Sequence, residues 1–269
     1  MSDADFPASA FESLGGGVYR ATALTRGPWD PGHQHAGPPI ALVAREIARV
    51  AGPAGFPHLA RLTSNLIRPV PIGDIALEVQ AVYSGRNVAH YAATISSGGK
   101  PMALFTAVAQ RQDAVAIPPG LPGHPLAMAP RPPEDSEPAR FPFRTPAPGY
   151  PDFVESRVAT GTFFRGPSAV WFRLRYPLVA GEAPTALETV AAAADSGNGI
   201  SAVLEFGKYL FQNSDLTINL LRAPQGEWIC VDARTLIGPG GGGLAESQIF
   251  DRQGLIGRAT QSLAVRMRE

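Results

Sequence analysis

The densest run of prolines in this chain lies between Pro118 and Pro151 and divides the 269 residues near their middle. Proline fixes one backbone dihedral and removes a hydrogen-bond donor, so such a run is not expected to hold a helix or a central strand. We predict a largely extended linker over residues 116–155. It separates an N-terminal unit, residues 1–115, from a C-terminal unit, residues 156–269, and the chain is long enough for two small domains.

The two units repeat one pattern. Each contains an apolar stretch of predicted helix, GPPIALVAREIARVAG in the first unit and APTALETVAAAADSG in the second. A second pair of segments, SNLIRP and INLLRA, places Arg68 over Arg222 at a spacing of 154 residues. A third pair, GGKPMALFTAVAQR (98–111) and QGLIGRATQSLAVR (253–266), matches at a spacing of 155 residues. Several matches in the same order indicate an internal duplication.

One helix followed by alternating, strand-like segments in each unit predicts an α+β fold. We expect each unit to be a curved antiparallel sheet wrapped around its own central helix. Two such units can pair edge to edge into one continuous sheet, which removes two exposed strand edges. The sequence therefore predicts a double hot-dog, that is, two fused hot-dog units in one chain.

Charge and cysteine content narrow the classes of function. The chain has 23 Lys and Arg against 23 Asp and Glu, so we expect neither nucleic-acid binding nor a polybasic membrane patch. The single cysteine, Cys230, allows no internal disulfide and favours a cytoplasmic protein. No apolar run has the roughly 18 residues of a membrane span, and zinc-type Cys/His spacing is absent from the sequence.

The stretch VAAAADSGNGIS ends an alanine-rich helix in a carboxylate, Asp195. An Asp in front of Ser-Gly-Asn-Gly is also a common turn former, so this pattern alone leaves a structural role open. Gln261 alternates with Ala259 and Leu263 along an apolar strand, and Asn213 stands two residues before an Asp. We expect Asp215 to form a structural ion pair with Arg222 or Arg175.

Four stretches give the chain a resemblance to a known family: GPWDPGHQHAGPPIAL, AAADSGNGIS, NSDLTINLLR and GEWICVDARTLIGPGGGGLAESQIFDRQGLIGRATQSL. Together they cover roughly half of the sequence. The chain resembles the double hot-dog acyl-CoA thioesterases, the acyl-CoA thioesterase II-like group. The resemblance implies hydrolysis of an acyl-CoA by a water molecule held by Asp195, Asn213 and Gln261. Better-known members carry a hydroxyl residue at the position of Asn213.

Thioester hydrolysis also needs donors aimed at the developing oxyanion. His35, Ala36 and Gly37 open the first predicted helix, where backbone N–H groups have no helical partner. The first unit has Val50 where the second has Asp195, and Thr106 where the second has Gln261. We therefore expect one active site per chain, with oxyanion donors from the first unit and water-activating side chains from the second.

Two alternatives stay open at this point. Asp30 and His35 stand five residues apart, which is the spacing of hot-dog enoyl-CoA hydratases, although the intervening Asn-Pro of those enzymes is missing. A non-catalytic acyl-CoA or lipid-binding protein is the other alternative. For the thioesterase we expect no metal, no cofactor and no covalent intermediate, since Gly-x-Ser-x-Gly is absent from the sequence. Homo-oligomers, dimer or tetramer, are also expected of fused hot-dog units.

Overall fold

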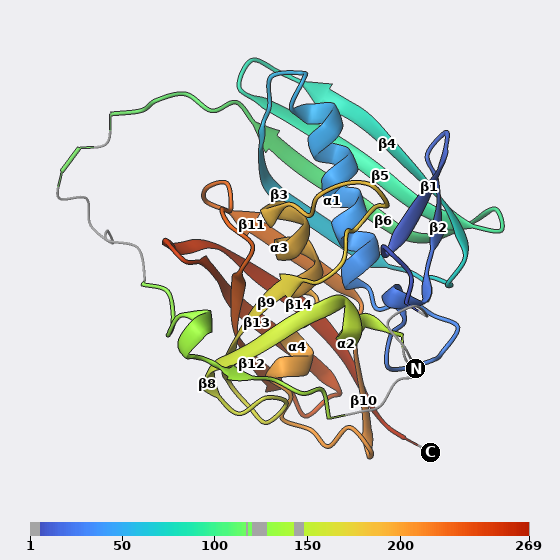
Figure 1. Cartoon of the computed structure of the whole chain (residues 1–269), viewed down its shortest axis with the longest axis vertical. Helices are drawn as coiled ribbons and strands as arrows, with labels where there is room; N and C mark the ends of the chain where they lie inside the picture. Colours follow the sequence, from blue (N-terminus) through green and yellow to red (C-terminus); the bar gives the residue numbers. More distant parts are fainter. Residues whose placement is uncertain (1–5, 117, 120–127, 143–147, 269) are drawn as a thin grey trace.

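The computed structural model describes residues 6–116, 118–119, 128–142 and 148–268. These residues form one 14-stranded sheet whose strand pairings are all antiparallel, with the order β1-β2-β4-β5-β6-β3-β11-β14-β13-β12-β9-β8-β7 and with β10 paired to β14 (Figure 1). The predicted α+β arrangement of two helix-bearing sheets joined edge to edge is confirmed.

The N-terminal half supplies the first six strands and one long helix. In chain order these elements are β1 (Phe11–Gly15), β2 (Val18–Ala21), the short 3-10 helix η2 (Ala23–Thr25), α1 (Gly37–Ala51), β3 (His58–Leu66), β4 (Asp74–Ser84), β5 (Val88–Ser97) and β6 (Lys100–Gln110).

The rest of the described chain supplies the other strands, one 3-10 helix and three α-helices. In chain order these are the 3-10 helix η3 (Pro133–Asp135), β7 (Glu137–Pro138), α2 (Tyr150–Phe153), β8 (Val154–Gly161), β9 (Ser168–Leu174), α3 (Ala186–Ala194), α4 (Gly197–Ile200), β10 (Tyr209–Asn213), β11 (Asp215–Leu220), β12 (Ile229–Ile237), β13 (Gly242–Asp251) and β14 (Gly254–Met267).

The two long helices pack against each other in opposite directions. Helix α1 starts with two prolines, which suit a first turn because their missing N–H groups would be unpaired there. Helix α3 starts with a capping box in which Thr185 and Glu188 satisfy each other's backbone N–H groups. A Cβ on Gly37 would lie 2.5 Å from the carbonyl oxygen of Ala192, so the start of α1 touches the last turn of α3. Only glycine allows this close approach.

Strands β3 and β11 join the two halves at the centre of the sheet. Thr63 pairs with Thr217, and their hydroxyl oxygens lie 3.1 Å apart. The hairpins on either side are equivalent at a spacing of 154 residues, including the β-bulge, which follows Ile95 in one half and Ile249 in the other. The duplication inferred from the sequence is therefore present in the strand pairing itself.

This register corrects one detail of the sequence analysis. Thr106 pairs with Thr63 just as Thr260 pairs with Thr217, so the counterpart of Thr106 is Thr260 and not Gln261. The counterpart of Gln261 is Ala107, which is buried as Gln261 is. The spacing of 155 residues was wrong by one, and a slip of one residue moves a side chain to the opposite face of a sheet.

The proline-rich region holds more regular structure than expected. Strand β7 is an outermost strand, where proline is tolerated. Helix α2 lies inside the predicted linker and contradicts the expectation of an extended segment there. Pro151 is compatible with this helix, because it occupies the first turn and needs no hydrogen-bond donor there. Residues 117, 120–127 and 143–147 of the predicted linker lie outside the described residues.

The expected ion pair of Asp215 is also wrong. Arg222 binds the buried carboxylate of Asp251 through two contacts of 2.6 Å, while Asp215 accepts a hydrogen bond from the backbone of Ser262. In the part of the chain that the structure describes, no helix is both long and apolar enough to cross a membrane.

Candidate active site

A cavity of about 600 Å³ opens where the start of α1 meets the end of α3. Its wall combines the loop before α1, the segment after β3, the end of α3 and the strand β10. The predicted residues His35, Ala36, Asp195 and Asn213 line this cavity. Elements from both halves therefore build one site, as the sequence analysis expected.

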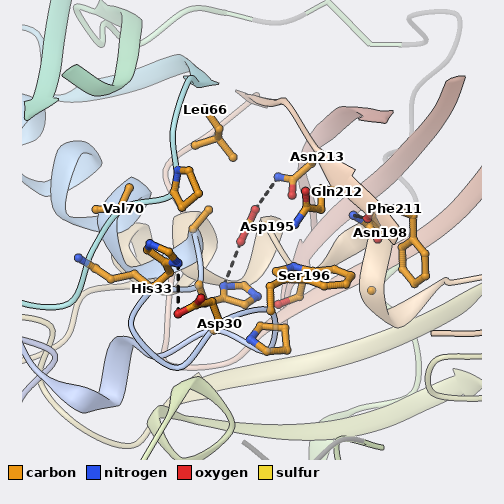
Figure 2. Close-up of a pocket in the computed structure, with 18 of the residues that line it drawn as sticks. Asp30, His33, Leu66, Val70, Asp195, Ser196, Asn198, Phe211, Gln212 and Asn213 are labelled. Carbon is orange, nitrogen blue, oxygen red and sulfur yellow. Dashed lines mark hydrogen bonds and ion pairs between the residues drawn. The ribbon is translucent and has the colours of Figure 1, made fainter. Parts of the chain in front are cut away.

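Asp195 occupies the middle of this site and is only 7% exposed (Figure 2). The amide nitrogen of Asn213 donates to one carboxylate oxygen at 2.8 Å. The Nδ1 atom of His35 lies 3.0 Å from the other oxygen. A carboxylate at the C-terminal end of a helix is disfavoured by the helix dipole, so these two contacts offset an unfavourable position. An ordinary turn residue would not need them.

The contact between His35 and Asp195 determines which ring nitrogen of His35 carries a proton. An ionised carboxylate can only accept hydrogen bonds, so the approach of Nδ1 to Asp195 requires a hydrogen on Nδ1. The backbone nitrogen of Gly37 also lies 3.1 Å from Nδ1, and it can donate only when Nδ1 carries no hydrogen. The position of one proton in the His35–Asp195 pair therefore decides whether Nδ1 can accept a hydrogen bond from the Gly37 amide.

The three predicted oxyanion donors differ in availability. The His35 amide donates to the carbonyl of Thr25 at 2.7 Å and is already used. Gly37 is buried behind the wall of the cavity. Ala36 lines the cavity, and its N–H forms no hydrogen bond with the described residues. Ala36 is therefore the best placed of the three donors.

Tyr150 packs against His35 of the His35–Asp195 pair, and its role in the site was not predicted from the sequence. Its ring stacks on His35 with ring centroids 3.7 Å apart and an angle of 2° between the planes. Its hydroxyl donates to the carbonyl of Ala192, so the hydroxyl of Ser196 must be the donor in their 3.0 Å contact. Burial, with the nearby charge of Asp195, raises the pKa of Tyr150 and keeps the phenol neutral. No pattern in the proline-rich stretch distinguishes this tyrosine.

Gln261 is buried beneath the end of α3 and does not line the cavity. Its side-chain nitrogen donates to the backbone carbonyl of Asp195 at 3.1 Å, and its oxygen accepts from the backbone of Asn198 at 2.9 Å. A Cβ on Gly197 would lie 2.8 Å from the hydroxyl of Ser247 and 3.2 Å from the same Gln261 oxygen, so this position favours glycine. In this structure Gln261 holds the backbone that carries Asp195.

The structure does not bring the hydratase pair together. Asp30 accepts from the backbone of Gly32 at 2.7 Å and lies 3.4 Å from the Nδ1 atom of His33 (Figure 2). His35 turns to Asp195 instead. Among the described residues no cluster of three or more His, Cys, Asp or Glu side chains could hold a metal ion.

Apolar rings surround the polar centre. Trp29 stacks on Phe206 at 4.8 Å between ring centroids, and Phe141 meets Phe164 edge to face at 5.9 Å. The backbone of Phe164 is held in the left-handed region, with φ of 61°. Such strain in a non-glycine residue is typical of functional sites. The cavity thus offers an apolar wall next to one buried carboxylate.

Two family models match most of the chain. The model of the acyl-CoA thioesterase N-terminal domain matches residues 25–112, and that of the C-terminal domain matches residues 133–265. No curated protein matches the chain.

Among solved structures, the chain is similar to an acyl-CoA thioesterase II, TesB2, of Mycobacterium marinum (17% identity, TM-score 0.64, 96% of this chain and 95% of that one covered). It is also similar to a tesB protein of Mycobacterium avium subs paratuberculosis (16%, TM-score 0.69, 95% of each chain). A hot-dog protein of Alicyclobacillus acidocaldarius, of unknown function, matches over 97% of each chain (18%, TM-score 0.69). At these identities the structures support the hot-dog fold.

Proposed function

The chain belongs to the acyl-CoA thioesterase family and is a thioester hydrolase, and on that premise we propose that its nucleophile is a water molecule bound to Asp195. The substrate is an acyl-CoA, and the products are a free acid and CoA. The observation that carries this proposal is the buried Asp195 carboxylate, held by Asn213 and His35 at the wall of the cavity. A carboxylate held in this way can orient a water and accept its proton.

In the proposed reaction, water attacks the thioester carbonyl and transfers a proton to the Asp195–His35 pair. The oxygen of the tetrahedral intermediate takes up negative charge next to the Ala36 amide, which lines the cavity. The carbon–sulfur bond then breaks, and the leaving thiolate takes the proton back from the pair. Each step uses groups that the cavity already brings within reach.

Asn213 takes the place of the hydroxyl residue that the family resemblance implies. Its amide nitrogen already donates to Asp195, which is what a hydroxyl would do. We propose that its carbonyl oxygen accepts a hydrogen bond from the nucleophilic water. We propose Gln261 as a positioning residue, because both of its polar atoms bind the backbone around Asp195.

The test measures thiol release from a panel of acyl-CoAs, short to long, straight, branched and aromatic. Asp195→Asn keeps the shape of the side chain but removes the base, and we expect kcat to fall about 10²- to 10⁴-fold. Asp232→Asn is the matched control, since Asp232 lies on β12 away from the cavity. If Asp195→Asn retains wild-type kcat, Asp195 does not act on water. If the wild type hydrolyses none of the panel, the proposed function is overturned.

We further propose a cellular setting and an oligomeric state for this protein. The single, buried Cys230 supports a cytoplasmic location, because a free thiol persists in a reducing compartment, and an acyl-CoA substrate supports a role in lipid metabolism. A homodimer or homotetramer stays a prediction that the molar mass in solution would test.

A further inference from the structure

The duplicated halves treat one pair of equivalent arginines differently. Arg222 follows β11 and is bound at both nitrogens by Asp251, whose carboxylate is fully buried. Arg68 follows β3 at the equivalent position. The hairpin register places Ser97 where the C-terminal half has Asp251, and Lys100 where it has Gly254. The N-terminal half thus lacks the carboxylate at this position and has a second cation nearby.

Arg68 is exposed and lines the cavity that holds Asp195. One guanidinium nitrogen donates to the carbonyl of Pro101 at 2.7 Å, which anchors the side chain beside the hairpin that carries Lys100. Arg68 forms no ion pair with any carboxylate in the described part of the chain. Since a guanidinium has five N–H donors, most of its fork is available to an anion at the mouth of the cavity.

We propose that Arg68 binds a phosphate group of the CoA moiety at the mouth of the cavity. The pantetheine arm then runs along the cavity from Arg68 towards Asp195, since both residues line it. This proposal rests on the proposed function, because it assigns the nucleotide end of the same substrate. Arginine suits this role, since its planar fork matches the oxygens of a phosphate and keeps its charge at every physiological pH.

The test compares two thioesters of one acyl group, the best acyl-CoA of the wild type and the matching S-acyl-pantetheine, which carries no phosphate. We expect Arg68→Ala to lower the ratio of kcat/KM for acyl-CoA to kcat/KM for acyl-pantetheine about 10- to 100-fold. Arg258→Ala, an exposed arginine on β14 outside the cavity, should leave the ratio at its wild-type value. The wild-type KM for acyl-CoA should also rise with salt, and more steeply than that of Arg68→Ala.

The outcomes separate the two proposals. An unaltered ratio in Arg68→Ala, or an equal loss on both thioesters, would overturn phosphate binding by Arg68 while wild-type hydrolysis still supports the proposed function. Failure of the wild type to hydrolyse either thioester would overturn both. The acyl-dephospho-CoA, run alongside, shows whether the 3′-phosphate or the diphosphate carries the loss.

Discussion

The two ends of the α1–α3 helix pair are formed by equivalent elements, yet one end is hollow and the other is filled. Where the start of α1 meets the end of α3, the cavity of about 600 Å³ contains Asp195. Towards the start of α3, apolar side chains of both helices and of the strands β3 and β11 leave a space of only about 10 Å³. At this filled end Arg45 binds Glu182, and its Nε lies 3.7 Å from Glu188.

This difference shows how a duplicated chain can have a single site. Glu188 is buried, and its burial raises the pKa of the carboxyl. It is nevertheless tied to the Thr185 backbone, and it faces Arg45 across the helix pair. A carboxylate with a permanent cation beside it is a structural group, while Asp195 has a titratable histidine beside it and an open cavity in front. The partners of each carboxylate separate the two roles.

The largest effect in this comparison is expected at the hollow end. In Gly37→Ala the new Cβ would lie 2.5 Å from the carbonyl of Ala192, so the start of α1 must shift. Displacing His35 and the Ala36 amide should lower kcat/KM about 10²-fold, with a loss of folding free energy of about 1–3 kcal/mol. Hydrolysis assays and urea unfolding measure both. Gly207→Ala is the control, because no atom lies within 4 Å of its added Cβ. Wild-type kinetics in Gly37→Ala would mean that the helix contact does not set the site.

At the filled end we expect a loss of stability instead of activity. Arg45→Ala leaves Glu188 buried without its cation and should lower the free energy of unfolding by about 3 kcal/mol, with kcat near the wild-type value. Arg49, with 61% of its side chain exposed, is the matched control, and Arg49→Ala should cost less than about 1 kcal/mol. Urea unfolding checks the first expectation and thiol release the second. A selective fall in kcat for Arg45→Ala would show that the filled end is not merely structural.

Much of this fold could be predicted from the sequence because the duplicated halves contain matching segments. Arg68 and Arg222 are 154 residues apart, and the same spacing separates Thr63 and Thr217, which pair between β3 and β11. The second spacing failed because it aligned Gly99 with Gly254. Gly98 and Gly99 form the turn of their hairpin, whereas Arg252 and Gln253 form the equivalent turn and Gly254 already belongs to β14. Aligned glycines alone do not determine a strand register. The shift of one residue matched Gln261 with Thr106 instead of Ala107.

The site was less predictable than the fold. Asp195 and Asn213 could be placed because local segments resemble those of a family. The stack of Tyr150 on His35 could not, because it joins residues far apart in the sequence and Tyr150 stands in a stretch without periodicity. The partner of His35 was equally hidden, since His35 precedes one helix and Asp195 ends the other.

The smallest effect concerns the hairpin clamp that only the C-terminal half possesses. Burial opposes ionisation of Asp251, but Arg222 and the backbone N–H groups of Gln225 and Gln253 together lower the pKa of its carboxyl. A lowered folded-state pKa means stability that is fully present above the ordinary value of 3.8 and is lost as the pH falls through the folded value. Asp251→Asn should cost about 1–2 kcal/mol at pH 7 and progressively less below pH 3.8.

Urea unfolding of the wild type and of Asp251→Asn at several pH values tests this expectation. Asp215→Asn is the control, because Asp215 accepts from a backbone N–H and pairs with no arginine in the described residues. A constant difference in unfolding free energy between the wild type and Asp251→Asn across the pH range would show that Asp251 does not titrate with folding.

The central pairing of β3 with β11 also has a consequence for the order of events on the ribosome. Thr63 and Thr217 stand 154 residues apart, so β3 leaves the ribosome long before its partner exists. At about 5–20 residues per second, the wait is roughly 10–30 s. During that time the nascent N-terminal half has its own helix and hairpins, but the edge of β3 that later pairs with β11 is unpaired. Such an edge is the part of a sheet most prone to pair with another chain. The newborn polypeptide is therefore most vulnerable to aggregation until β11 has been made.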